Sequence, residues 1–328
     1  MIGRRGRPAD APASVAVVTD STASLPPDVA RRWGVGVVPL DVLVGAQRHV
    51  EGVDLTSAGL LAALQSGARV STSQPPPAAF AAAYTAAAEA GAREVVSIHL
   101  SGELSGTVQA ARLAAREAPV PVHVVDARTT VMALGWTVLE AARFARDVTV
   151  PALLEGPPVP PEPQPLGFGR RIGRLLAPPE PVAPLPDGAA VAAHAGAGAR
   201  GTRAWFLVDS LDHLRRGGRL SAPAAALGTV LGLRPLLTLG DGRVVVAEKV
   251  RTRRAARERL EQAARTHAAG LARTRVTVHH LGQADLAAEL LTHVRTWPGV
   301  IESVAAETSA VVAAHVGPGL LAIVVAEA

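Results

Sequence analysis

The chain has 328 residues, 48% of them hydrophobic, which is enough apolar material for about two buried domain cores and excludes a disordered chain. Its 33 Lys+Arg against 28 Asp+Glu leave a net charge of +5, and with 3% aromatic residues it lacks the basic, aromatic-rich patches of a nucleic-acid binder. Having no cysteine, it cannot form disulfides, thiolate metal sites or a cysteine nucleophile.

No targeting or membrane segment is evident in the sequence. The apolar run that follows the basic N-terminus, residues 15–18, is too short for the core of a signal peptide. No uninterrupted run of about 18 apolar residues occurs, so no segment is expected to span a bilayer. We therefore expect a soluble, cytoplasmic protein whose residues 1–13 form a flexible N-terminal segment.

The first half of the chain alternates short β-rich runs with Ala-rich segments of helical length. We expect strands over 15–18, 36–40, 94–100 and 122–125, and helices over 26–33, 55–66, 80–90, 106–117 and 131–144. Asp54 is expected to be the N-cap of the helix over 55–66. Strands separated by helices predict right-handed βαβ crossovers, and hence an N-terminal α/β domain over 14–150 with a mainly parallel sheet and flanking helices.

Residues 151–203 differ from the rest of the chain in composition. Twelve prolines lie between Pro151 and Pro186, and an Ala/Gly run follows over 188–201. Because proline fixes φ and removes a hydrogen-bond donor, we expect no regular helix or central strand here. The stretch is predicted to be a mobile insertion or linker, in which the basic fragment 168–176 forms at most a turn or two of amphipathic helix.

Regular patterns resume after the insertion. Strands are expected over 204–208, 243–250, 276–281 and 320–325, and helices over 210–216, 250–269 and 286–296. This mixture predicts a C-terminal α/β or α+β domain over 204–328. The expected fold class is therefore α/β with two domains.

Three clusters rich in hydroxyl side chains follow or join predicted strands. They are Thr19-Asp20-Ser21-Thr22, Ser71-Thr72-Ser73-Gln74-Pro75 and the segment from Ser101 to Thr107. Because the carboxyl ends of parallel strands line one crevice, we expect the clusters to meet there. Neutral donors and helix N-terminal amides suit an anionic oxygen group. Taken singly, each cluster is equally typical of a helix cap or an ordinary turn.

Motifs along most of the chain resemble those of one bacterial family. In order they are VAVVTDST (15–22), VGVVPLDV (35–42), STSQPPP (71–77), SIHLSGELSGT (97–107), VVDAR (124–128), LDHLRRGGRLS (211–221), LGLRPLL (231–237) and HVGPG (315–319). This pattern resembles the DegV family, bacterial fatty-acid-binding proteins that include the binding subunit of fatty acid kinase. The resemblance leaves out only about residues 1–13 and 151–200.

The resemblance implies a long-chain fatty acid in a tunnel between two domains. It implies that the hydroxyls of Thr72 and Ser105 hold the carboxylate and that His315 is a third contact. A separate ATP-binding kinase subunit would phosphorylate the bound acid, so the chain is expected to be a carrier without catalytic residues, cofactor or metal. The other candidate ligand-binding residues are Ser73, Ser101, Gly106, Thr107, Asp20 and Ser21.

Arginine carries nearly all the positive charge, because Lys249 is the sole lysine. Arg215, Arg216, Arg219 and Arg234 either complement a helix dipole or dock an acidic partner or, transiently, an anionic membrane. The arginines of the helix over 250–269 are expected to form a solvated face. These are Arg251, Arg253, Arg254, Arg257 and Arg259.

Other functions remain open on sequence alone. A serine hydrolase acting on a lipid-like ester is the main alternative, although Ser105 sits one place late for a G-x-S-x-G motif. A nucleotide-dependent kinase would need a P-loop, which the sequence lacks. DNA binding by the arginine-rich stretches would be strongly salt-dependent. His279 and His280 point to opposite faces of a predicted strand and make a poor metal pair.

Overall fold

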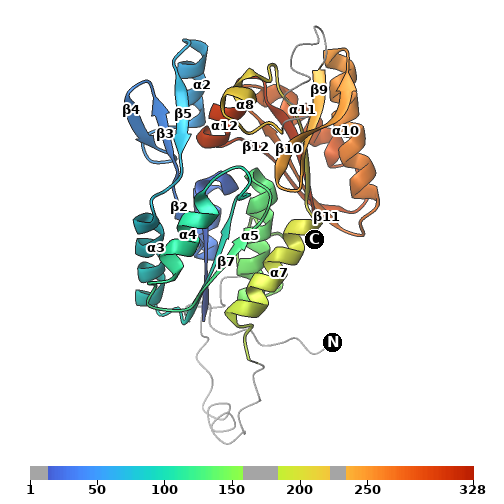
Figure 1. Cartoon of the computed structure of the whole chain (residues 1–328). Coiled ribbons are helices and arrows are strands. Elements are labelled where there is room, and N and C mark those ends of the chain that lie inside the picture. The colour runs from blue at the N-terminus through green and yellow to red at the C-terminus, as the bar shows by residue number, and fades with distance from the viewer. Residues whose placement is uncertain (1–13, 158–183, 222–233) are drawn as a thin grey trace, which may run out of the picture.

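A computed structural model describes residues 14–157, 184–221 and 234–328. Within them a four-stranded parallel sheet forms the centre of the N-terminal half (Figure 1). Its order is β2 (Gly36–Val38), β1 (Val15–Asp20), β6 (Glu94–His99), β7 (Val122–Asp126). β1 is apolar over 15–18 because both of its faces are covered, as is usual in parallel sheets. The mainly parallel sheet expected from the sequence is confirmed.

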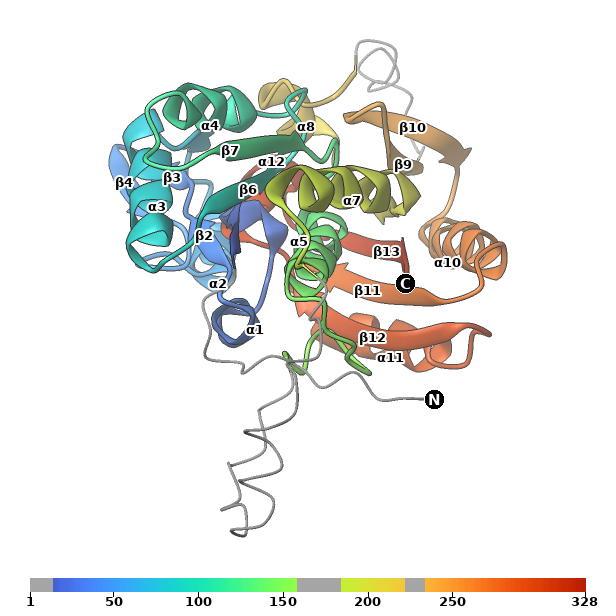
Figure 2. The same cartoon turned by 90° about the horizontal axis from the view of Figure 1, so that it is seen from below.

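Helices cover both faces of this sheet. α1 (Pro27–Trp33) and α5 (Val131–Ala145) pack on one face, and α3 (Pro77–Glu89) and α4 (Thr107–Ala115) pack on the other. α5 lies between the parallel sheet and a second sheet in the C-terminal half (Figure 2). It joins the halves through Trp136 Nε1, which donates to Thr277 Oγ1 at 2.9 Å, and through an ion pair between Glu140 and Arg275 at 2.6 Å.

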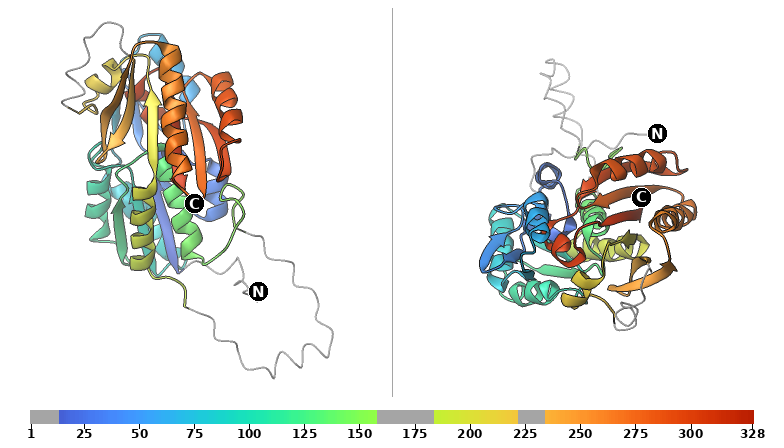
Figure 3. Two further views of the ribbon diagram at one scale, coloured as in Figure 1. Left: turned by 90° about the vertical axis from the view of Figure 1, so that its right-hand side faces the viewer. Right: turned by 90° about the horizontal axis from the view of Figure 1, so that it is seen from above.

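The second sheet has six strands. Its order is β10 (Arg243–Val250), β9 (Arg234–Gly240), β8 (Arg203–Leu207), β13 (Leu321–Glu327), β11 (Thr274–His280), β12 (Val300–Glu307). All neighbours are antiparallel except β11 and β12. α10 (Arg253–Ala269) and α11 (Ala284–Val294) cover its outer face (Figure 3). The sequence analysis missed β9 and β12, but the two-domain α/β class is confirmed.

A third, antiparallel sheet was not expected from the sequence. It consists of β4 (Gln47–Val50), β3 (Asp41–Val44) and β5 (Val70–Ser73), and α2 (Ser57–Gln65) connects β4 to β5. The predicted N-cap of α2 was wrong. Thr56 accepts from Gly59 N at 3.1 Å, whereas Asp54 accepts from Val50 N at 2.6 Å and closes the preceding turn.

The helix α7 (Gly188–Gly201) lies within the stretch for which no regular helix was expected. Pro186 is the last proline of this stretch, and the residues after it are rich in alanine, which has the highest helix propensity. These residues can therefore form a helix, although the stretch as a whole is rich in proline. Asp187 caps α7 by accepting from Ala190 N at 2.8 Å, and the His194 ring stacks on Phe144 of α5 at 4.3 Å. The segments 1–13 and 168–176 lie outside the described residues, and the domain boundaries stay a prediction.

Two short helices complete the C-terminal half. α8 (Asp212–Arg216) and α12 (Ala310–Val316) pack together with the third sheet and the inner face of the six-stranded sheet. α12 was missed by the sequence analysis. No helix among the described residues is both long and apolar enough to cross a membrane.

Candidate functional site

A cavity of about 280 Å³ lies where the three sheets meet, and residues from both halves line it. The N-terminal half contributes β5 and the segments that follow β1, β6 and β7. The C-terminal half contributes β8, β9, β10, β11, β13, α8 and α12. Most of the lining is apolar, and it includes Leu40, Leu104, Phe206, Leu239, Val244, Val312, Val316 and Ala322.

One wall of the cavity is the inner face of the six-stranded sheet. Phe206, Ala322 and His279 are paired across β8, β13 and β11, and all three line the cavity. Met132 N donates to His279 Nε2 at 3.1 Å, and Nδ1 donates to Ala306 O at 3.2 Å. Burial lowers the pKa of His279 to about 4, so this ring is neutral and adds no charge to the wall. No metal-ligand cluster forms around it or elsewhere among the described residues.

The hydroxyl of Thr72 and the ring of His315 meet at the cavity wall. Thr72 Oγ1 lies 2.8 Å from His315 Nε2, although the two residues are far apart in sequence. Both line the cavity, and so does Ser73, whose hydroxyl donates to Asp41 Oδ2 at 3.4 Å. The structure therefore brings together the TSQP and HVGPG motifs.

His315 is held in place by its surroundings. It lies in the last turn of α12, whose first turn is fixed by Glu51, because Val311 N donates to Glu51 Oε1 at 2.6 Å. A Cβ on Gly217 would lie 2.5 Å from His315 Nδ1, so only glycine fits at that position. Burial, with a smaller contribution from the charge of Arg219, lowers the pKa of His315 to about 4. His315 is therefore neutral at physiological pH.

The LSGT segment lies against the TSQP segment. Leu104, Ser105 and Gly106 line the cavity, and a Cβ on Gly106 would overlap the side chain of Gln74. Ser105 Oγ lies 2.8 Å from Thr107 Oγ1 and accepts from Thr107 N at 3.3 Å, which closes the turn before α4, whose N-cap is Gly106. Thr107 itself is buried behind the cavity wall. A local turn and cavity lining, which the sequence offered as alternatives for this cluster, thus occur together, whereas no side chain caps α4.

Arg219 was predicted to belong to a surface patch that docks a partner, but it lies in the wall of the cavity. It lines the cavity, its Nε donates to Leu104 O at 2.9 Å, and its Nη1 donates to Gly217 O. Burial lowers its pKa, but an arginine remains charged, so the cavity contains a fixed cation that the sequence analysis did not expect. Arg215 and Arg216 are exposed on α8. Arg234 lies elsewhere and pairs with Asp209.

Besides Thr107, three predicted ligand-binding residues do not line the cavity and instead support the residues around it. Asp20 Oδ1 accepts from both Thr22 N and Thr22 Oγ1, and Thr22 is a lining residue. Ser21 Oγ accepts from Leu40 N at 3.0 Å. Ser101 Oγ donates to Gly242 O at 2.8 Å, which joins the loop after β6 to the β9–β10 turn. We therefore expect these residues to position the site rather than contact a ligand.

The structure contains a buried, hydrogen-bonded Ser-His-Asp arrangement that the sequence analysis did not identify. Ser97 Oγ lies 2.6 Å from His99 Nε2, and His99 Nδ1 donates to Asp20 Oδ2 at 2.9 Å. All three residues are completely buried, and Ser97 Oγ also contacts Tyr84 OH at 2.8 Å, so no substrate reaches the serine. Within the described residues Ser105 has no histidine partner. The geometry therefore does not support a serine hydrolase.

The low pKa of His315 predicts a pH-dependent stability. Between pH 6.5 and about 4 the unfolded chain binds a proton that the folded His315 does not, so stability falls as the pH falls through this range. One such histidine changes the free energy of unfolding by roughly 1 kcal/mol per pH unit there. Denaturant unfolding at several pH values should give a shallower dependence for His315→Gln than for the natural chain. Equal slopes would mean that His315 is not held neutral.

Comparison with known proteins agrees with the motifs. The model described as "Uncharacterised protein, DegV family" matches residues 14–148 and 188–328. A DegV domain-containing protein of Streptomyces coelicolor is 42% identical over 95% of this chain and 98% of its own length. One from Deinococcus radiodurans is 36% identical over 94% of this chain and 97% of its own.

Solved structures show the same architecture. A DegV family protein from Thermus thermophilus, whose structure is described as showing fatty acid binding, is 36% identical with a TM-score of 0.77. DegV from Bacillus subtilis, described as a fatty acid binding protein, is 26% identical with a TM-score of 0.77. Each match covers 96% of this chain and 99% of the other.

Proposed function

The chain is a member of the DegV family, and from that premise we propose that it binds one long-chain fatty acid in the cavity between its halves. The observation that carries the proposal is a largely apolar cavity in which the Thr72 hydroxyl meets His315. The solved relatives from Thermus thermophilus and Bacillus subtilis, described as binding fatty acids, support it.

The acyl chain provides most of the affinity in this proposal. Burying about 14–16 methylene groups at about 0.8 kcal/mol each contributes on the order of 11–13 kcal/mol before the costs of association. Leu239, Val244, Val312 and Phe206 offer the apolar surface for this burial. The polar groups need then only orient the acid.

The carboxylate is proposed to lie beside Thr72, Ser105 and His315. A neutral His315 with its proton on Nε2 donates to Thr72 Oγ1, and the Thr72 hydroxyl is then free to donate to the carboxylate. If the Thr107 hydroxyl donates to Ser105, the Ser105 hydroxyl is free in the same way. The nearby Arg219 cation partly balances the negative charge while its guanidinium is engaged by backbone carbonyls.

We further propose that the bound acid is presented to a separate ATP-dependent kinase subunit, which forms an acyl-phosphate. Neutral hydroxyl donors leave a carboxylate oxygen nucleophilic, whereas a bidentate arginine would occupy both oxygens. The sequence has no P-loop of its own. The chain is therefore a carrier in this scheme, and transient contact with a membrane surface would supply the acid. Binding of ATP by the isolated chain would contradict this division of roles.

Native mass spectrometry tests the binding function directly. The protein incubated with palmitate or oleate and then desalted should carry the mass of one fatty acid per chain, and solvent extraction should recover that acid. A matched short acid such as butyrate should not be retained, since it buries too few methylene groups. Failure to retain either long-chain acid would contradict the proposed function.

A further inference from the structure

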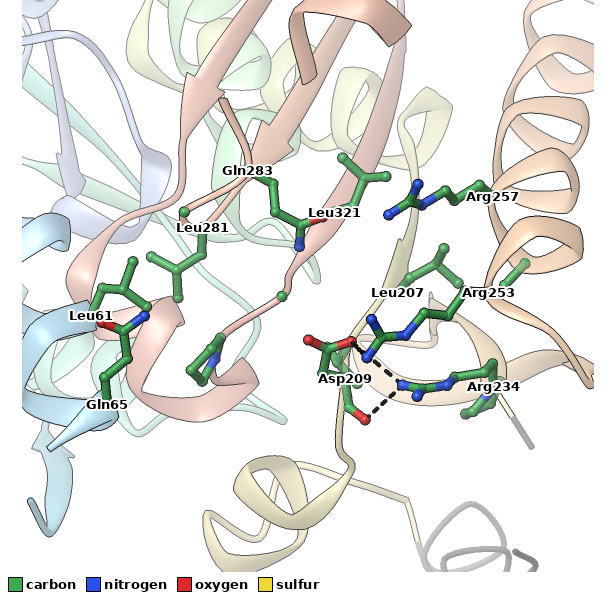
Figure 4. A pocket seen from close by; sticks show the side chains of 16 residues that line it. Leu61, Gln65, Leu207, Asp209, Arg234, Arg253, Arg257, Leu281, Gln283 and Leu321 are labelled. Carbon is green, nitrogen blue, oxygen red and sulfur yellow. Dashed lines mark hydrogen bonds and ion pairs between the residues drawn. The ribbon is translucent and has the colours of Figure 1, made fainter. Parts of the chain in front are cut away.

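A second pocket, of about 260 Å³, lies at one end of β8, β11 and β13, between α2 and α10 (Figure 4). Leu207 and Leu321 are paired across β8 and β13 and line this pocket. The next residues along the same strands, Phe206 and Ala322, are also paired and line the cavity. Because successive side chains of a strand point to opposite faces, these two pairs of side chains face different hollows.

Three arginines and one carboxylate surround the second pocket. Arg253 and Arg257 extend from α10 toward the strand ends, and Arg234 lies at the start of β9 (Figure 4). Asp209 Oδ1 lies 3.3 Å from Arg253 Nη2 and 3.4 Å from Arg234 Nη1. Arg257 has no hydrogen bond or ion pair with any other residue that the structure describes. Both Arg253 and Arg257 are exposed, in agreement with the solvated face expected from the sequence, and they also border this pocket.

The charges that line the pocket do not cancel. Three arginines and one aspartate give +3 − 1 = +2. A single carboxylate ligand would leave one positive charge unbalanced, whereas a phosphate group carries about −1.5 to −2 at pH 7. Guanidinium forks also match the oxygen geometry of phosphate. The side chain of Gln283, which points into the same space, adds an uncharged amide donor.

We propose that this pocket binds a dianionic phosphate group, either free or carried by a small molecule. Arg257 and Arg253 provide the principal contacts, and Asp209 holds Arg253 and Arg234 in place. Leu207, Leu281 and Leu321 form an apolar base on which the carbon atoms of a phosphomonoester can pack. The pocket shares no lining residue with the cavity, so phosphate and fatty acid should not compete.

Calorimetric titration at constant ionic strength tests the proposal with inorganic phosphate and with glycerol 3-phosphate. Both should bind saturably. Arg257→Gln should weaken binding about tenfold or more, as expected for the loss of a charge-assisted hydrogen bond, and Arg253→Gln should have a similar effect. Tighter binding of glycerol 3-phosphate would identify a phosphomonoester, and equal binding would identify free phosphate.

Arg254→Gln is the matched control, because Arg254 lies on the same helix, is 91% exposed and pairs with Glu258 outside the pocket. It removes the same charge and should leave phosphate binding unchanged. Equal weakening by Arg254→Gln would show unspecific attraction to a basic helix and overturn the proposal. So would the absence of saturable binding, or acetate binding as tightly as phosphate. None of these results depends on whether the cavity holds a fatty acid.

Discussion

Replacing Val312 with tryptophan should abolish fatty-acid binding and leave the fold intact. On α12, Val312 precedes His315 by three residues and Val316 by four. The three side chains therefore share one face of the helix, and all of them line the cavity. Val312 is only partly buried, so a larger side chain can extend into open cavity space instead of a packed core. The indole would occupy volume that the acyl chain needs.

The measurement is retention of oleate by native mass spectrometry, with thermal unfolding as the check of folding. Val312→Ala is the matched control, because it enlarges the same space and should retain the acid. A Val312→Trp protein that folds and still carries one fatty acid would place the acyl chain outside this cavity. The proposed function would then lose its structural basis, while the phosphate proposal would be unaffected.

The parallel sheet could be predicted from sequence because its central strands are marked by short apolar segments. Val15–Val18 is a continuous apolar run, and the core of β6 (VVSI) is interrupted only by Ser97, as expected for strands buried on both faces. β4 (QRHV) is mostly polar, and Glu and Ser divide the apolar residues of β12 (VIESVAAE), so neither strand gives such a run. Their places are set by pairing with β3 and β11, which are tertiary contacts that local patterns do not record.

The site was predicted through its motifs more than through its chemistry. Thr72, Ser105 and His315 do line one cavity, but nothing local predicts that Ser101 turns toward Gly242, a hydrogen-bond partner 141 residues away. Arg219 was assigned to the surface because a run of arginines resembles a charged patch. Its burial depends on the carbonyls of Leu104 and Gly217. Such a role is visible only once the chain is folded.

Helical periodicity would have assigned the arginines of α10 to different faces of the helix. Arg253 and Arg257 are four residues apart and therefore share a face, and that face borders the second pocket. Arg254, the next residue after Arg253, faces solvent, and Arg259 pairs with Glu248 of β10. The sequence analysis treated them as one charged face, although their spacing already divides them into different environments.

Thr72→Val should weaken fatty-acid binding by about 10- to 100-fold without abolishing it, since it removes one hydrogen bond to a charged group. Valine keeps the shape of threonine, so the burial of the acyl chain is unchanged and a measurable affinity remains. The substitution also removes the hydrogen-bond partner of His315 Nε2, which loosens the orientation of the carboxylate. Fluorescent fatty-acid displacement measures the affinity.

Thr72→Ser distinguishes the effect of the hydroxyl from that of the methyl group. It should retain most of the affinity because the hydroxyl oxygen Oγ is kept. With ATP and a fatty acid kinase subunit, acyl-phosphate formation at saturating fatty acid should follow the same order, with the natural chain and Thr72→Ser well above Thr72→Val. A lower product yield from Thr72→Val at full occupancy would show that the hydroxyl orients the acid as well as binding it. Unchanged affinity and unchanged product in Thr72→Val would place the carboxylate elsewhere in the cavity, with Thr22 and Thr130 as the remaining threonine hydroxyls of its lining.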